Sequence, residues 1–239
     1  MRVSTIAERH RGQKIWGFSQ SSLRVWVHYA GFSTFGICGA LTAHWIHCRA
    51  SEGVSLSSKL GLYEKWKVGA GPFTFTRLRS LNIRELRSVA KSQWGWAHDK
   101  DNSYMNNVGA WLRERGVYPV PGLGEDSSIQ IVNPGAQPLS MTDFLIASLD
   151  QLNDHYVIIT VSGKVFGHFS AAHAVSLYIG PAGMAQQCTF FDPNHGEYCF
   201  NNKQDFFNFF REYYRRKILS NGFGSLGLSD RWRTHVYTL

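Results

Sequence analysis

Three residues that are far apart in the chain have the types needed for nucleophilic acyl transfer: Cys38, His173 and Asp192. Cys38 follows the small-residue turn FSTFGI and begins CGALTAHWIHCRA, in which apolar residues recur at helical spacing. A thiol at a helix N-terminus lies among unpaired backbone N–H groups and the positive end of the helix dipole, which both stabilise the thiolate. Cys38 is therefore the candidate nucleophile.

His173 and Asp192 lie in two strand-like runs that follow. His173 is surrounded by alanines in SAAHAVSLYIG, and Asp192 ends the apolar run TFFD directly before a Pro-Asn-x-Gly turn. From an adjacent strand, the Asp192 carboxylate is expected to accept the Nδ1–H of His173, which fixes the tautomer and stabilises imidazolium. Taken singly, each residue has a structural explanation, because buried Cys and His are common in cores and Asp is common in turns. The combination predicts a Cys-His-Asp triad.

The segments GICGALTAHWI, AHAVSLYI and FFDPNHGEY together resemble the YopT/AvrPphB family of bacterial type III effector cysteine proteases, a papain-like clan. The resemblance implies Cys38 as nucleophile, His173 as base and Asp192 as the orienting residue. About 135 residues separate Cys38 from His173, within the roughly 130–150 of papain-like enzymes. The resemblance to this family also implies an α+β papain-like fold, with a helical N-terminal lobe carrying the Cys and an antiparallel sheet lobe carrying the His and Asp.

The sequence departs from the papain-like pattern at the oxyanion hole. Such enzymes commonly supply a Gln or Asn side chain a few residues before the Cys, and residues 32–37 (FSTFGI) contain neither. The candidate donors are the backbone N–H of Cys38, the Ser33 hydroxyl and the Gln20 amide. Each such donor is worth about 3–4 kcal/mol to the transition state.

The pattern along the chain changes from helix to strand. Apolar periodicity predicts helices over residues 38–50, 82–94 and 104–115, and a Gly- and Pro-rich loop over 116–138. Ser140 and Asp143 resemble a capping box that opens a further helix. Later runs predict strands in HYVIITVSG, HAVSLYIG, QQCTFFDP and THVYTL, and a helix in DFFNFFREYYRRK.

We expect residues 1–30 to form an N-terminal arm or docking segment and residues 31–239 a single catalytic domain. Its helical lobe would cover about 31–153 and its sheet lobe about 154–239.

The four cysteines are too few for a disulfide-stapled fold, so free thiols are expected. His44 and Cys48 could share a ligand face of one helix, but no second pair completes a metal site. Trp94, Trp96, Trp111 and Tyr104 have the near-helical spacing of core residues. No metal or organic cofactor is expected.

Charge and composition limit the partners. The formal charge of +8 favours acidic partners or an anionic membrane surface, and the absence of a recognised motif argues against nucleic acid. The N-terminus lacks a signal-peptide pattern, so we expect secretion by another route, with action in a target or host cell. The leading function is cleavage of a host or target protein, and an inhibitory or immunity protein is a further candidate partner. The alternatives are a deamidase, transglutaminase or acyltransferase with the same triad, or a non-catalytic binding module on the same fold.

Overall fold

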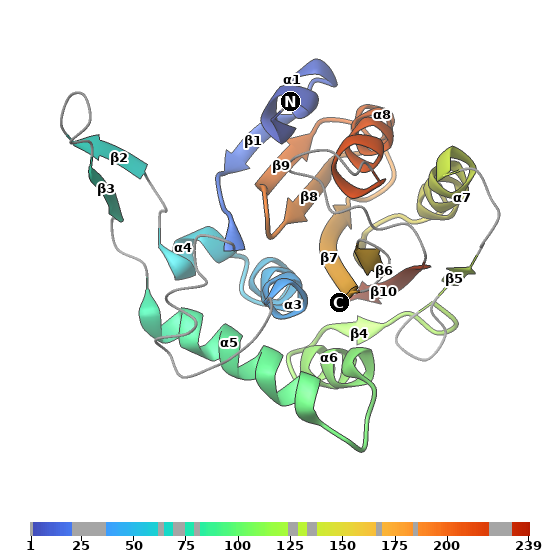
Figure 1. Ribbon diagram of the computed structural model, residues 1–239. Helices are drawn as coiled ribbons and strands as arrows, with labels where there is room; N and C mark the ends of the chain where they lie inside the picture. Colours follow the sequence, from blue (N-terminus) through green and yellow to red (C-terminus); the bar gives the residue numbers. More distant parts are fainter. Residues whose placement is uncertain are drawn as a thin grey trace.

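The computed structural model describes residues 2–20, 37–61, 65–68, 75–78, 82–123, 129–132, 138–165, 169–183, 186–219 and 231–239. An antiparallel sheet runs through the molecule, with helices on both sides (Figure 1). In chain order the elements are α1 (Val3–Arg9), β1 (Gln13–Trp16), α3 (Cys38–Ala50), α4 (Leu56–Leu60), β2 (Lys65–Val68), β3 (Phe75–Leu78), α5 (Ile83–His98), α6 (Tyr104–Arg113), β4 (Tyr118–Pro119), β5 (Ile129–Val132), α7 (Pro138–Asp150), β6 (His155–Val165), β7 (Phe169–Ile179), β8 (Cys188–Asp192), β9 (Gly196–Phe200), α8 (Lys203–Tyr213), the π-helical turn η3 (Tyr214–Leu219) and β10 (Arg231–Thr238).

The main sheet has the strand order β1-β9-β8-β7-β6-β10-β4, with β5 also paired to β10. β6 and β7 pair along their whole length. β7 and β8 pair over a shorter stretch, which runs from the pair Ser176 and Phe191 to the pair Ile179 and Cys188. His173 and Asp192 therefore lie just beyond the paired region, where β7 and β8 part.

The two faces of the sheet support two core clusters. Successive side chains of a strand point to opposite faces, so Val157 and Ile159 of β6 join one cluster and Tyr156 and Ile158 join the other. The first cluster contains residues of α1, α7 and α8, and the second contains residues of α3, α4, α5 and α6. The helix that begins at Cys38 and the helix α8 thus cover opposite faces of one sheet.

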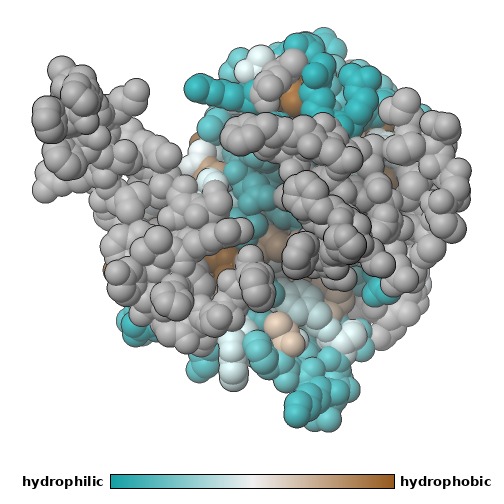
Figure 2. Space-filling model, viewed as in Figure 1, coloured by the Kyte–Doolittle hydropathy of each residue, from teal (hydrophilic) through white to brown (hydrophobic). Residues whose placement is uncertain are grey.

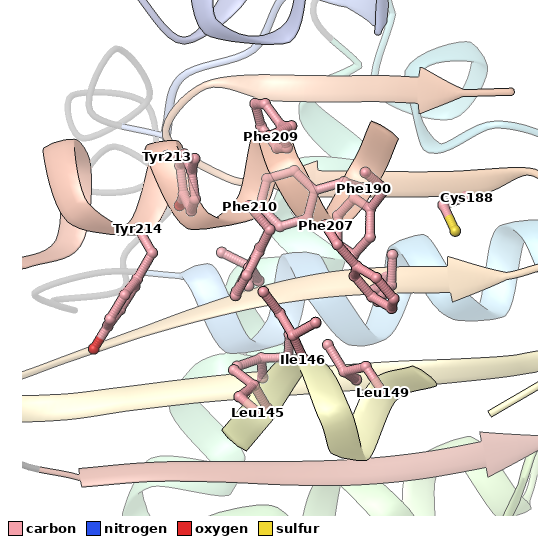
Figure 3. Close-up of a cluster of buried hydrophobic side chains, with 14 of the residues drawn as sticks. Leu145, Ile146, Leu149, Cys188, Phe190, Phe207, Phe209, Phe210, Tyr213 and Tyr214 are labelled. Carbon is pink, nitrogen blue, oxygen red and sulfur yellow. The ribbon is translucent and has the colours of Figure 1, made fainter. Parts of the chain in front are cut away.

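Helix α8 is held on its face of the sheet by aromatic packing. Phe206, Phe209, Phe210 and Tyr213 recur at the spacing of one helix face and are all buried. Each ring centroid lies 5.2–6.1 Å from that of Phe190 in β8 (Figure 3). This cluster fixes Tyr213 beside the end of β8.

Helix α3 is buried on most of its surface, including every residue from Gly39 to Ile46. Ser176 of β7 donates its hydroxyl to the Thr42 carbonyl oxygen at 3.3 Å. At the other end of the helix, Arg49 donates to the buried Glu197 carboxylate of β9 at 2.7 Å. These contacts fix the helix relative to the sheet, and so position its first residue.

The described part of the predicted N-terminal arm, residues 2–20, packs on the sheet. α1 joins the core cluster of α8, and β1 pairs with β9. Gly196 permits this approach, because a Cβ there would lie 2.0 Å from the Trp16 carbonyl oxygen and its φ is +102°. Residues 21–30 lie outside the described residues, so the division of the chain at residue 31 stays a prediction, as do the two lobe ranges.

The chain contains more strand than the sequence predicted. β4 and β5 lie within residues 116–138, which were expected to form a loop, and both are held by backbone pairing to β10. α7 begins at Pro138, so the prediction that Ser140 caps it was wrong. Proline suits the first helical position because its φ is already helical and its missing N–H is not needed there.

The expected aromatic core on α5 and α6 is correct only in part. Trp96, Trp111 and Tyr104 are partly buried against the second core cluster. Trp94 is 45% exposed and stacks on His98 one turn later, on the outer face of α5. The near-helical spacing did not distinguish the inner face from the outer one.

The described surface is mainly polar. On the face drawn in Figure 2, hydrophobic residues are confined to small patches. Among the described helices, none has the length and apolarity needed to cross a bilayer. The large apolar side chains that are exposed in the described segments are Ile15, Val54, Ile83, Trp94, Tyr118 and Leu239.

Candidate active site

Cys38 is the first residue of α3 and is partly exposed. Its N-cap residue, Ile37, makes no side-chain capping bond, so the N–H groups of the first turn are left to other partners. The backbone N–H groups of Gly39 and Ala174 hydrogen-bond to the Cys38 sulfur. The sequence prediction of a thiol at a helix N-terminus is confirmed.

His173 is buried in β7 and hydrogen-bonds on both sides. Its Nε2 lies 2.9 Å from Oδ1 of Asp192, and its side chain also bonds to Cys38. The expectation that Nδ1 faces Asp192 was wrong. Nε2 faces the carboxylate, which leaves Nδ1 for the sulfur. The sequence predicts adjacent strands, but the side chain's rotamer decides which ring nitrogen points along the sheet and which toward α3.

Asp192 is buried at the end of β8 and accepts hydrogen bonds on both carboxylate oxygens. Oδ1 accepts from His173 and from the Asn194 N–H at 2.8 Å, and Oδ2 accepts from the Tyr213 hydroxyl at 2.7 Å. His195, three residues after Asp192, has its Nε2 3.9 Å from Oδ2. Burial opposes the charged carboxylate, but the charges of His195 and His173 and these hydrogen bonds hold the pKa of Asp192 well below its usual range.

The electrostatics of the other two residues favour an ion pair. Burial raises the pKa of the Cys38 thiol, but the hydrogen bond and charge of His173, with the backbone N–H groups of Ala174 and Gly39, lower it below its ordinary value. Burial alone would lower the pKa of His173, yet Asp192 and Cys38 raise it well above its ordinary value. Both shifts favour a thiolate–imidazolium pair over a neutral one.

Tyr213 is a site residue that sequence reasoning missed. Burial and the negative charge of Asp192 raise the pKa of Tyr213, so its hydroxyl stays a neutral donor to the carboxylate. Its spacing with the phenylalanines of α8 is that of a core residue. Only the position of its hydroxyl, which requires the packing of α8 on β8, reveals the contact.

Gln20 lies close to the start of α3 although it precedes Cys38 by 18 positions in the sequence. Its Oε1 accepts the Ile37 N–H at 3.2 Å, and its Nε2 donates to Asn194 Oδ1 at 2.9 Å. Its own backbone N–H donates to the Pro193 carbonyl oxygen at 2.7 Å. The amide thus joins the residue before Cys38 to the turn after Asp192. Ser33, the other side-chain candidate, lies outside the described residues.

The remaining thiols and histidines differ from this arrangement. All four cysteines are free, as expected, and burial raises the pKa of Cys48 and of Cys188 to about 12. His44 packs against Trp111, and burial lowers the pKa of His44 to about 3. Among the described residues, no group of three His, Cys, Asp or Glu side chains could hold a metal ion. The absence of a metal stays a prediction.

Comparison with known proteins bears on this geometry. The chain matches the family Peptidase_C58, described as Yersinia/Haemophilus virulence surface antigen, over residues 4–222. No curated protein matches it. Its fold is similar to that of Pseudomonas avirulence protein AvrPphB, with a TM-score of 0.52, 10% identity and coverage of 85% of this chain and 92% of that chain. The YopT domain of Pasteurella multocida PfhB2 toxin matches with a TM-score of 0.28, 18% identity and coverage of 90% and 91%.

The family match spans most of the chain, and the likeness to AvrPphB confirms the predicted α+β papain-like fold. The resemblance to the YopT/AvrPphB family, based on three short segments, is confirmed as well. The chain belongs to the Peptidase_C58 family of virulence proteins and is a cysteine protease.

Proposed function

We propose that the protein hydrolyses a peptide bond in a target protein, with Cys38 as nucleophile, His173 as general acid and base, and Asp192 as orienting residue. The observation that carries the proposal is the position of His173, which hydrogen-bonds to Asp192 at 2.9 Å and to the Cys38 thiol. Nucleophile and base within hydrogen-bond reach, with the base oriented by a third group, is the arrangement that acyl transfer needs.

In the first half of the reaction, the Cys38 thiolate attacks the scissile carbonyl carbon and forms the carbon–sulfur bond. The imidazolium of His173 then gives its proton to the amine nitrogen as the carbon–nitrogen bond breaks. In the second half, neutral His173 takes a proton from water, and the resulting hydroxide displaces Cys38 from the thioester. The carboxylic acid leaves and the ion pair is restored, while Asp192 stays charged throughout.

Two donors are proposed for the oxyanion hole: the Cys38 backbone N–H and the Gln20 side-chain amide. Among the described residues the Cys38 N–H has no acceptor, since it is the first N–H of α3. The Gln20 amino group has two hydrogens and uses one for Asn194, so the other is available to a substrate oxygen. Ser33 stays a candidate as a third donor.

The target is proposed to be a protein of the host cell, reached by a route that does not use a signal peptide. A net charge of +8 repels strongly basic segments, so we expect acidic residues near the cleaved bond. The same charge favours an anionic membrane surface, and an inhibitory or immunity protein would need an acidic face to cover the site.

The test is mass spectrometry of a proteome-derived peptide library after incubation with the wild-type protein or with Cys38→Ala. The expected result is new peptide termini with the wild type and none with Cys38→Ala. Cys199→Ser is the matched control, since Cys199 is also partly exposed but lies on β9, and it should cleave as the wild type does. Cleavage by folded Cys38→Ala would overturn the proposal.

The same spectra separate the alternatives. A gain of about one dalton on glutamine without cleavage would indicate a deamidase, and a cross-linked or acylated peptide would indicate a transferase. Peptides that bind but are never altered would favour the non-catalytic binding module.

A further inference from the structure

The helix that carries Cys38 is capped by residues from other elements. Its first N–H groups have no acceptor inside the helix, and the N-cap residue Ile37 supplies none. The N–H of Ile37 is taken by Gln20, as described above. The N–H of Ala40, two residues after Cys38, donates to Oε1 of Gln93 at 3.1 Å. Gln93 belongs to α5, so this cap comes from 53 positions further along the chain.

The Gln93 oxygen accepts a second hydrogen bond, from the Tyr104 hydroxyl of α6 at 2.7 Å. That hydroxyl packs closely against the backbone of Gly39, the residue after Cys38, because a Cβ added to Gly39 would lie 2.3 Å from the Tyr104 oxygen. Burial, with the negative charge of Cys38, raises the pKa of Tyr104 well above its ordinary value. Tyr104 is therefore a neutral donor close to the thiolate.

These contacts account for each N–H of the first turn. The Ala40 N–H is taken by Gln93, and the Gly39 N–H hydrogen-bonds to the Cys38 sulfur. The Cys38 N–H has no acceptor among the described residues, so it is left for the substrate oxygen. Without Gln93, the Ala40 N–H would have to find water, and the turn would lose its link to α5 and α6.

We propose that Gln93 and Tyr104 are positioning residues of the active site. Together they hold the first turn of α3 so that the Cys38 thiolate stays hydrogen-bonded to His173 and to the Gly39 N–H. This role rests on the proposed function of Cys38 as nucleophile. A residue that merely joined three helices would affect stability and leave the pKa of Cys38 unchanged, so the two roles give different results.

The test is the rate of Cys38 alkylation by iodoacetamide as a function of pH, with the modified peptide identified by mass. Gln93→Met keeps the length of the side chain and removes the acceptor, and Tyr104→Phe keeps the ring and removes the donor. Ser92→Ala is the matched control, since Ser92 neighbours Gln93 but bonds to Ser88 and His44.

For the wild type and Ser92→Ala, the apparent pKa of Cys38 should lie well below the free-thiol value of about 8.5. Gln93→Met should move it upward by at least about one unit, which is a tenfold loss of thiolate at pH values well below both pKa values. Tyr104→Phe should move it in the same direction by less, because Gln93 still accepts the Ala40 N–H.

The outcomes separate this inference from the proposed function. An ordinary pKa of Cys38 in the wild type would overturn the proposed function itself. A low pKa in the wild type that is unchanged in both variants would overturn the positioning role alone. If circular dichroism shows that Gln93→Met does not fold, Tyr104→Phe decides, because it changes only one oxygen atom.

Discussion

Replacing Tyr213 with Phe removes one oxygen atom from the buried site and leaves the aromatic packing of α8 in place. The Tyr213 hydroxyl donates to Oδ2 of Asp192 at 2.7 Å. Nε2 of His195 lies 3.9 Å from Oδ2, too far for a hydrogen bond. In the variant, Oδ2 of a carboxylate that is 1% exposed has lost its hydrogen-bond donor.

A hydrogen bond to a charged group contributes about 1.5–3 kcal/mol, and this bond is fully buried. We therefore expect Tyr213→Phe to lower the free energy of unfolding by about 1.5–3 kcal/mol at pH 7. The pKa of Asp192 is depressed in the folded protein, so the stability it contributes is complete above its unfolded value of about 3.9. The unfolded chains of variant and wild type titrate alike, so the difference between them should stay constant from about pH 5 to 8 and shrink only as the pH falls through the pKa of Asp192 in the folded variant.

The assay is urea unfolding followed by tryptophan fluorescence at several pH values. Tyr214→Phe is the matched control, because Tyr214 is the next residue and packs on Trp232 without a bond to Asp192. It should lose much less stability than Tyr213→Phe. Equal losses in the two variants, or a loss in Tyr213→Phe that changes between pH 5 and 8, would show that the hydrogen bond to Asp192 is not its cause.

Three further predictions concern the surroundings of the site. Gln20→Ala should lower kcat by about 10²–10³ with little change in KM, and an unchanged kcat in steady-state kinetics would exclude Gln20 from the oxyanion hole. Arg49→Leu should cost about 3–5 kcal/mol in urea unfolding because it leaves the Glu197 carboxylate buried and unpaired, and a loss below about 1 kcal/mol would contradict this. Gly196→Ala should expose the amides of β1 to hydrogen exchange, since its Cβ would lie 2.0 Å from a backbone oxygen of that strand; Gly183→Ala, with nothing within 4 Å, should not.

Local patterns were sufficient for the long elements of the fold. The predicted helix 38–50 matches α3 at both ends, because its apolar residues, its small-residue turn and its first cysteine all lie within one segment. The strands around His173 and Asp192 were likewise predicted from β-branched and aromatic runs. β4 and β5 were missed because two and four residues carry little periodicity, and their pairing partner β10 lies about a hundred residues away.

The contacts between distant elements could not be predicted. Which nitrogen of His173 faces Asp192 depends on a side-chain rotamer at the point where β7 and β8 separate. Tyr213 and Gln93 enter the site through single polar atoms on helices whose sequences indicate core packing or a helix surface. Gln20 was named as an upstream amide, yet its place beside Ile37 follows only from the path that brings β1 along β9.

The central claim is that Cys38 carries the acyl group during hydrolysis. The most direct measurement is acid quenching of the protein during turnover of an activated peptide ester, followed by mass analysis of the digested protein. We expect one acyl group per chain on the peptide that contains Cys38, and much slower acylation in His173→Ala. An acyl group found on Cys199 instead, or equal acylation rates in both proteins, would contradict it.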